Sequence, residues 1–182
     1  MKALIWWPYL IWLRFRGPKT AARAVLTCNE KLRLAILAAF GAQIGRGTRI
    51  RTPMHIMGRY EDFSNLRVGE RTYVGPDCLF DLSAPIEIGD RAAISARCSF
   101  VTHLNGGASA LDALYPSDIG AVRVGSDTWV GIGATVLMGY EIGNRTMIAA
   151  GSVVNADVRG SVLAGGVPVR EIKPLPSPEE EA

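Results

Sequence analysis

The chain has 182 residues, a formal net charge of +3 at pH 7 and 48% hydrophobic residues. This length corresponds to one domain, or to one domain with a short appendage, and it can bury a sizeable core. The charge is mild, and no stretch dense in Lys and Arg is interleaved with aromatic residues in the repeat region, which argues against nucleic acid as a partner. Of the three cysteines, Cys78 and Cys98 fall at the same small-residue position of their hexapeptides and are interpreted as buried small side chains, and this cysteine usage suits a reducing, cytoplasmic compartment.

The first sixteen residues form an apolar, Trp-rich run that ends in Arg14 and Arg16. As a helix, about eleven apolar residues reach only ~16 Å, well short of a hydrocarbon core of ~30 Å. Two interpretations stay open. Residues 1–16 either lie at a membrane interface, at the inner face of the membrane, or pack on the body of the protein or on a neighbouring subunit.

Residues 20–40 are rich in Ala, Leu, Arg and Lys and contain no Gly or Pro, and Gly41 fits the position just after a helix. The composition predicts one helix or two short ones, which would cap the open end of a repeat fold. Residues 1–42 therefore form an apolar and helical N-terminal segment.

The strongest pattern is an aliphatic residue at every sixth position between residues 124 and 154. A period of six fits neither the 3.6 residues of a helix nor the alternation of a single strand. It is typical of hexapeptide β-helices, in which three short strands make one triangular coil of about 18 residues. We predict an all-β solenoid, a parallel β-helix of hexapeptide repeats with an N-terminal helical segment. The aliphatic residues are Val124, Val130, Val136, Ile142, Ile148 and Val154.

The same period runs through the earlier part of the chain with two interruptions. A slip across residues 62–66 indicates a looped-out corner, and residues 106–121 lack the period altogether. Long loops in compact repeat folds usually carry function, so the loop at 104–121 belongs with the candidate site. The β-helix domain is expected to span residues 43–165. A terminal turn and an acidic tail, expected to be disordered, would occupy residues 166–182.

Only two histidines occur, His55 and His103. His55 falls at a corner of its hexapeptide and is interpreted as a surface residue. His103 stands in F-V-T-H-L-N-G-G, at the end of the last strand before the long loop. A neutral imidazole at such an edge can accept a proton near neutral pH, so His103 is the candidate general base.

Several motifs together resemble the left-handed β-helix acyltransferase superfamily. These are the hexapeptide repeats, T-H before a loop, D-T-W-V-G at residues 127–131 and the closing G-V-P-V-R-E-I-K at residues 166–173. Within that superfamily, L-R-L-A-I-L-A-A-F-G-A-Q-I-G and C-L-F-D-L-S-A-P-I-E-I-G-D are similar to polysaccharide O-acetyltransferases of the colanic-acid type and to the galactoside and maltose type. The resemblance covers residues 32–173 and implies that the coil winds left-handed.

The resemblance implies an acetyl-CoA-dependent O-acetyltransferase that modifies a sugar hydroxyl in bacterial exopolysaccharide, capsule or related glycan biosynthesis. It implies a homotrimer with acetyl-CoA between adjacent subunits, a saccharide acceptor, no metal, and His103 as the base. Asp81 matches an acidic residue that would hold sugar hydroxyls or orient the imidazole, although a solvated corner Asp is the alternative. Acceptor contacts are expected at Asn105, Tyr115 and Trp129.

For the cofactor, the resemblance implies backbone contacts with the pantetheine arm and cationic contacts with the CoA phosphates. The residues concerned are Gly131, Ala150, Gly151, Asn155, Arg170 and Lys173. The motif T-H-L-N departs from the commoner family pattern, and this departure concerns the acceptor rather than the reaction type. Serine acetyltransferase-like enzymes, nucleotide-sugar N-acyltransferases and a non-catalytic trimeric scaffold stay open as alternatives. A γ-type carbonic anhydrase needs three zinc-binding histidines, and this chain has two.

Overall fold

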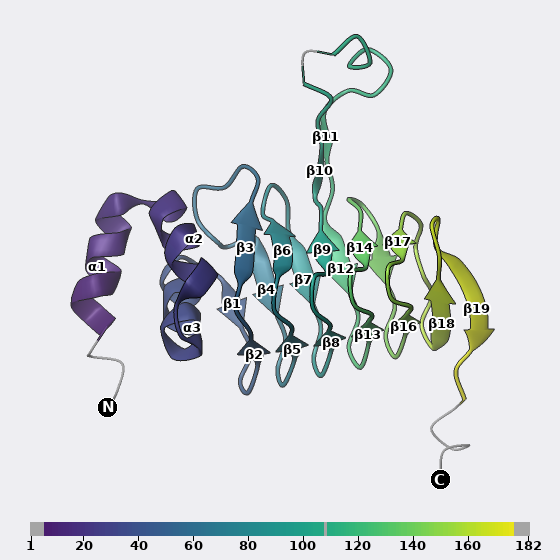
Figure 1. Cartoon of the computed structure of the whole chain (residues 1–182), viewed down its shortest axis with the longest axis horizontal. Coiled ribbons are helices and arrows are strands. Elements are labelled where there is room, and N and C mark those ends of the chain that lie inside the picture. The colour runs from purple at the N-terminus through teal and green to yellow at the C-terminus, as the bar shows by residue number, and fades with distance from the viewer. Residues whose placement is uncertain (1–5, 108, 177–182) are drawn as a thin grey trace.

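The computed structural model describes residues 6–107 and 109–176, in which three helices precede a long parallel β-solenoid (Figure 1). The acidic tail beyond residue 176, expected to be disordered, lies outside the described residues, as do residues 1–5 of the apolar run. The helices stand at one end of the solenoid, as expected for a cap on its first coil.

The solenoid has three faces, each a sheet whose strands come from successive coils. Sheet 1 contains β1 (Gln43–Ile44), β4 (Leu66–Val68), β7 (Ile86–Ile88), β12 (Val122–Val124) and β15 (Glu141–Ile142). Sheet 2 contains β2 (Arg49–Ile50), β5 (Tyr73–Val74), β8 (Ala93–Ile94), β13 (Trp129–Val130), β16 (Met147–Ile148), β18 (Val162–Gly165) and β19 (Arg170–Pro174). Sheet 3 contains β3 (Met54–Met57), β6 (Cys78–Asp81), β9 (Ser99–Phe100), β14 (Thr135–Val136) and β17 (Val153–Val154).

The six-residue period places its aliphatic residues inside the prism, as predicted. Val130 pairs in register with Ile94 on one side and Ile148 on the other, so equivalent residues stack from coil to coil. Val124 is 3% exposed and the other five repeat residues are 0% exposed. Cys78 and Cys98 are buried free thiols in the same core, which confirms their interpretation as small core side chains.

We name the three corners of the prism after the sheets that they connect: corner 1–2, corner 2–3 and corner 3–1. Corner 1–2 is built in the same way in several coils. A buried threonine donates its hydroxyl to a backbone carbonyl of the next coil, as Thr72 does to Gly89 (2.7 Å) and Thr128 to Gly143 (2.9 Å). Gly125 must be a glycine, because a Cβ there would lie 2.5 Å from the backbone nitrogen of Asn144.

The helical segment consists of α1 (Trp7–Arg16), α2 (Pro18–Thr27) and α3 (Glu30–Ala39). The two-helix alternative for residues 20–40 is therefore the correct one. The break comes at Asn29, whose side chain accepts a hydrogen bond from the Leu32 backbone nitrogen (3.0 Å) and so caps α3. Gly41 has φ +96°, the conformation expected just after a helix.

Two segments differ from the sequence expectation. The long loop contains a two-stranded antiparallel ribbon, β10 (His103–Leu104) with β11 (Asp118–Ile119), and it projects from the body of the prism (Figure 1). We call residues 103–119 the arm. The terminal turn is a hairpin, because β19 folds back antiparallel on β18. The turn between these strands includes Gly166 at φ +102°, a conformation that favours glycine.

Candidate active site

His103 and Asp81 meet at corner 3–1. β6 ends with Asp81, and the chain reaches His103 just after β9, which is the neighbour of β6 in sheet 3. The imidazole Nδ1 lies 2.5 Å from the Asp81 Oδ2. The Asp81 side chain is 0% exposed, whereas 30% of the His103 side chain is exposed. The structure therefore pairs a buried carboxylate with an imidazole that reaches the surface.

The Asp81 carboxylate is surrounded by hydrogen-bond donors. Its Oδ2 accepts from the Thr102 backbone nitrogen (2.8 Å), and its Oδ1 accepts from the Ser83 backbone nitrogen (3.2 Å) and the Ser83 hydroxyl (2.8 Å). Burial acts to raise the pKa of Asp81, but the hydrogen bonds from His103, Ser83 and Thr102 outweigh it and hold that pKa below its usual value. The alternative of a solvated corner residue is wrong.

A charged carboxylate at Nδ1 assigns a tautomer to His103 on hydrogen-bonding grounds. Nδ1 carries the proton that faces Asp81, and Nε2 is left to accept a proton from another molecule. His103 also lines a pocket of about 470 Å³, which is within the usual range for small-molecule sites. The pocket follows corner 3–1 and includes Met57, Arg59, Ser83, Asn105 and Asp118.

Gly58 and Arg59 were missed in the sequence, although both help to build this pocket. A Cβ on Gly58 would lie 2.0 Å from the Asp81 Oδ1, so only a glycine lets this backbone pass over the carboxylate. The Arg59 backbone nitrogen donates to the Ser83 hydroxyl (2.9 Å), which itself donates to Asp81. Gly58 follows β3 in M-G-R, but that pattern does not by itself indicate a carboxylate one coil away.

The three residues expected to contact the acceptor lie in different parts of the structure. Asn105 lines the His103 pocket, and its Oδ1 accepts from the Gly107 backbone nitrogen (2.7 Å). Tyr115 lies in the arm, is 62% exposed and does not line that pocket. Trp129 lies in sheet 2, where its indole nitrogen donates to the Ser95 hydroxyl (3.0 Å). A single chain thus brings Asn105, but neither Tyr115 nor Trp129, into the His103 pocket.

The small residues expected at the cofactor lie along corner 2–3. A Cβ on Gly131 would lie 2.6 Å from the Ala150 backbone nitrogen, so these residues stack in neighbouring coils. Ala150 and Gly151 are exposed, and they leave a strip of accessible backbone. The β18–β19 hairpin lies beside this strip, because a Cβ on Gly165 would come within 2.7 Å of the Ala149 Cβ.

Arg170 and Lys173 are both exposed on β19 of that hairpin. Asn155 is exposed too, but it directly follows β17 at the end of sheet 3 and therefore belongs to corner 3–1. Sheet 3 separates corner 2–3, with Ala150 and Gly151, from corner 3–1, with His103. The expected cofactor edge and the expected base therefore lie on opposite edges of one sheet within one chain.

His55 is half-exposed, as expected for a surface residue, and its Nε2 lies 3.6 Å from the Asp77 Oδ1. Within residues 6–107 and 109–176, no group of three or more His, Cys, Asp or Glu side chains is arranged to hold a metal ion. In the same part of the chain, no helix combines the length and apolar character needed to cross a bilayer.

No protein-family model matches the chain. Among curated proteins, it is 28% identical over 117 residues to "Putative acetyltransferase YvoF" of Bacillus subtilis (strain 168). That match covers 62% of this chain, and the chain spans 63% of the length of that relative.

Solved structures match over more of the chain. A maltose O-acetyltransferase from Clostridium difficile 630 superposes with a TM-score of 0.76 and 26% identity, covering 87% of this chain and 84% of that one. The hexapeptide-repeat acetyltransferase VCA0836 of Vibrio cholerae O1 biovar eltor, in complex with acetyl coenzyme A, superposes with a TM-score of 0.77. It is 24% identical, and the match covers 87% of this chain and 85% of that one.

Fold and site together define a left-handed hexapeptide-repeat β-helix with a histidine–carboxylate pair in a surface pocket. The chain shares this fold with solved hexapeptide-repeat acetyltransferases, and its curated relatives include proteins that are named as putative acetyltransferases.

Proposed function

We propose that the protein is an acetyl-CoA-dependent O-acetyltransferase acting on a sugar hydroxyl in bacterial exopolysaccharide, capsule or related glycan biosynthesis. The observation that carries the proposal is the buried Asp81 carboxylate at Nδ1 of His103, in a pocket open to a small molecule. The maltose O-acetyltransferase neighbour supports a saccharide acceptor and an ester product.

In this mechanism Nε2 of His103 takes the proton of the acceptor hydroxyl as that oxygen bonds to the thioester carbonyl carbon. The carbon–sulfur bond then breaks, and the proton on His103 passes to the departing thiolate. Asp81 keeps the imidazole in the required tautomer and stabilises the imidazolium. A sugar hydroxyl is too weak an acid to ionise unaided near neutral pH, and a positioned base accelerates such a step by about 10²–10⁴-fold.

Acetyl-CoA would lie along the strip of small residues at corner 2–3. Gly131, Ala150 and Gly151 leave room there for an extended pantetheine arm. Arg170 and Lys173, on the adjacent hairpin, would meet the phosphates, because guanidinium and ammonium groups both favour phosphate. The VCA0836 complex with acetyl coenzyme A supports the co-substrate. Asn155, on corner 3–1, would contact the cofactor from the side of His103.

We propose a homotrimer in which each site lies between two chains. Corner 2–3 and corner 3–1 are on opposite edges of sheet 3, so His103 and Ala150 of the same chain do not meet. When corner 3–1 of one copy faces corner 2–3 of the next, the base and the cofactor strip share one groove. A ring of three copies closes that arrangement. In the ring, Trp129 and Tyr115 would reach the groove of a neighbouring copy.

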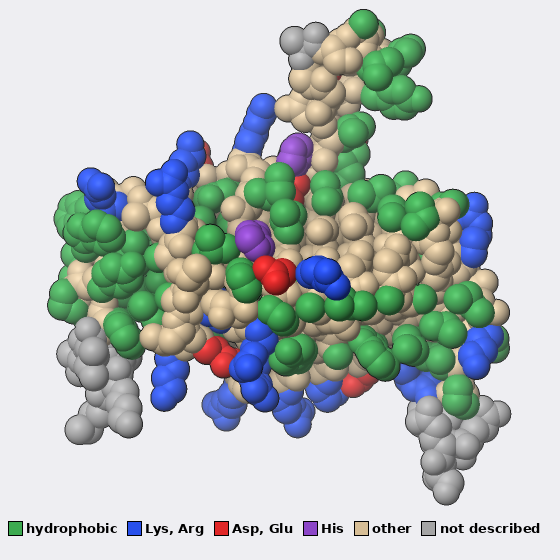
Figure 2. Space-filling view, viewed as in Figure 1, with side chains coloured by type: hydrophobic (Ala, Val, Ile, Leu, Met, Phe, Trp, Pro, Cys, Tyr) green, Lys and Arg blue, Asp and Glu red, His purple; other side chains and the backbone are tan. Residues whose placement is uncertain are grey.

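We further propose a cytoplasmic protein that rests on the inner face of the membrane through α1. Trp7 is 63% exposed, Trp12 is 47% exposed and Phe15 is 86% exposed, although Leu13 packs α1 onto the body. Figure 2 shows hydrophobic side chains over much of this end of the molecule. Arg16 lies over the Trp12 ring, and such cations are attracted to anionic lipid. Flotation with anionic liposomes, comparing the full chain with one that starts at Gly17, tests this; equal flotation contradicts it.

The enzymatic proposal is tested with purified protein, acetyl-CoA and a panel of polysaccharide repeat units, free sugars, serine and an amino sugar. We expect CoA release with a saccharide and a mass gain of one acetyl group that mild base removes as an ester. His103→Ala should abolish transfer, and His55→Ala, which changes the surface histidine, should not. A base-stable amide or acetylserine would support the rival enzymes, and absence of CoA binding by calorimetry would support the scaffold.

A further inference from the structure

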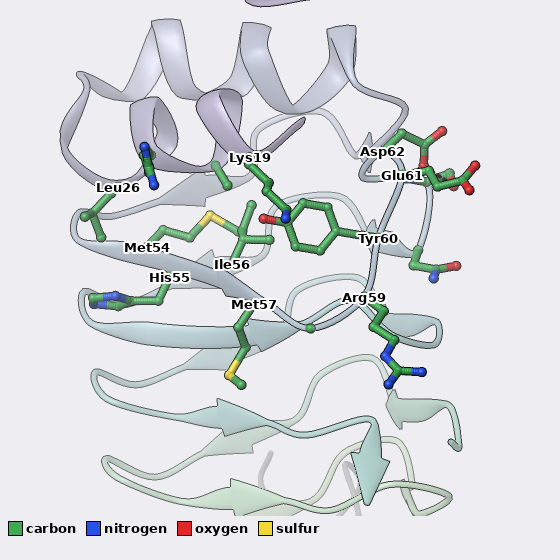
Figure 3. A pocket seen from close by; sticks show the side chains of 15 residues that line it. Lys19, Leu26, Met54, His55, Ile56, Met57, Arg59, Tyr60, Glu61 and Asp62 are labelled. Carbon is green, nitrogen blue, oxygen red and sulfur yellow. Dashed lines mark hydrogen bonds between the residues drawn. The ribbon is translucent and has the colours of Figure 1, made fainter. Parts of the chain in front are cut away.

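A second groove adjoins the His103 pocket. It has a volume of about 970 Å³ and lies between α2, β3 and the loop that follows β3 (Figure 3). The two cavities share Met57, Gly58 and Arg59 as lining residues. The two cavities are therefore neighbours along this stretch of chain, with Arg59 at both of them.

The groove carries three cationic side chains, Lys19, Arg23 and Arg59. Lys19 and Arg23 are four residues apart on α2, which places them on the same face of the helix. In the part of the chain that the structure describes, none of the three forms an ion pair. Their charges are therefore available to a ligand.

The acidic residues of the lining do not neutralise this arrangement. In Figure 3 the side chains of Glu61 and Asp62 lie at the edge of the groove and point away from Lys19 and Tyr60. The Asp62 carboxylate already accepts from the Ser64 backbone nitrogen (2.8 Å) and the Ser64 hydroxyl (2.6 Å). The Lys19 ammonium and the Tyr60 hydroxyl instead point toward one another and offer donors to the same space.

We infer that this groove binds an anionic group of the acceptor, a carboxylate or a phosphate, while the acceptor hydroxyl lies at Nε2 of His103. The inference rests on the proposed function, and it selects acidic over neutral saccharides as substrates. Guanidinium groups bind carboxylate and phosphate through paired hydrogen bonds, and an ammonium adds a point charge. The position of Arg59 between the two cavities makes it the link between the anionic group and the reacting hydroxyl.

The test compares a neutral disaccharide, the same disaccharide with a carboxylate, and the same disaccharide with a phosphate. Transfer is measured with wild type, Arg23→Gln, Arg59→Gln and Lys31→Gln. Lys31 is the matched control, because it is exposed on the neighbouring α3 and lines neither cavity. We expect the wild type to prefer an anionic acceptor. Arg23→Gln and Arg59→Gln should raise the KM for the anionic acceptor by about ten-fold or more, as loss of a charged hydrogen bond implies.

The neutral acceptor should respond little to Arg23→Gln, because Arg23 does not line the His103 pocket, and Lys31→Gln should behave as wild type with all three acceptors. Equal use of neutral and anionic acceptors by the wild type, or equal losses with both, overturns the inference and leaves the proposed function standing. If no acceptor is acetylated, the proposed function fails, and calorimetry with the same three disaccharides still decides about the groove. If the charged disaccharides bind and Arg23→Gln weakens that binding, the inference about the groove is supported. Identical binding of all three disaccharides contradicts it. Comparison of carboxylate with phosphate identifies which anion is preferred.

Discussion

Asp81 keeps a charge in a place where water cannot reach it. An isolated carboxylate in such a position would be costly, but this one accepts hydrogen bonds from Thr102, Ser83 and His103. Each of these donors stands at a fixed place in the coil that follows β6 or in the neighbouring coil. The carboxylate is therefore held by the β-helix itself, and the imidazole takes its orientation from it.

Replacing Asp81 with Asn should lower kcat by about 10²–10⁴-fold, since the amide no longer stabilises the imidazolium and can favour the wrong tautomer of His103. The KM for acetyl-CoA should change little. Steady-state rates of CoA release measure both quantities. Asp77→Asn is the matched control, because Asp77 is an exposed carboxylate near the other histidine, His55. An Asp81→Asn variant as fast as this control would remove Asp81 from the mechanism.

The same carboxylate makes stability depend on pH. The folded-state pKa of Asp81 lies below its unfolded value of about 3.9. The contribution of the charged carboxylate to the free energy of unfolding is therefore fully present above the unfolded pKa. It is lost as the pH falls through the folded-state pKa. We expect the free energy of unfolding, from urea titrations between pH 6 and about pH 3, to fall at the acid end for the wild type. The fall should be shallower in Asp81→Asn, and identical slopes would mean that Asp81 is not charged in the fold.

At the scale of elements, one buried cation links the helical cap to the prism in addition to the shared apolar core. Arg33 on α3 is 1% exposed, and its guanidinium donates to the backbone carbonyls of Val25 (3.2 Å), Cys28 and Ile50. These carbonyls belong to α2, to the link between the helices and to β2. Burial lowers the pKa of Arg33, but an arginine stays protonated in proteins, so all of its donors remain in place.

Arg33→Met should therefore destabilise the fold by about 2–4 kcal/mol, because it leaves buried carbonyls without donors. Urea unfolding followed by circular dichroism measures the change. Lys31→Met on the same helix is exposed and should stay within about 0.5 kcal/mol of the wild type. Equal stabilities for the two variants would show that the three hydrogen bonds hold the cap only weakly.

The elements also show what a single sequence can and cannot predict. The hexapeptide period predicted the strands and core from Val124 to Val154, because each position repeats one local environment. The arm and the β18–β19 hairpin do not follow the period, since their pairing depends on antiparallel contacts that no repeat encodes. The motifs identified His103 and Asp81, but the role of Gly58 depends on a carboxylate 23 positions later that only folding brings near. The groove with Lys19, Arg23 and Arg59 likewise joins α2 to a loop about forty residues away in the sequence.

At the scale of the whole molecule, one chain separates the two halves of the proposed site. Corner 3–1 carries the proposed base, the proposed acceptor pocket and the groove with Lys19, Arg23 and Arg59, whereas corner 2–3 carries the strip proposed for the cofactor. Sheet 3 lies between these two corners in every coil that contributes a residue to the proposed site. A closed ring of identical copies is the arrangement in which each copy supplies one edge to each of two neighbours. Sedimentation of the wild type should accordingly show a trimer.

Mixed trimers test the shared site directly. His103→Ala removes the base, and Ala150→Trp places a bulky side chain on the exposed cofactor strip without entering the core. Each variant alone should be inactive. The two variants are then unfolded, mixed in equal amounts and refolded. A site between chains is complete when the Ala150→Trp variant supplies its intact His103 and the His103→Ala variant supplies its intact Ala150. Random assembly makes about one quarter of the sites complete, so activity should return to about that fraction of wild type. A site within one chain cannot be rescued by mixing, and an inactive mixture of correctly assembled trimers would therefore place base and cofactor on the same subunit.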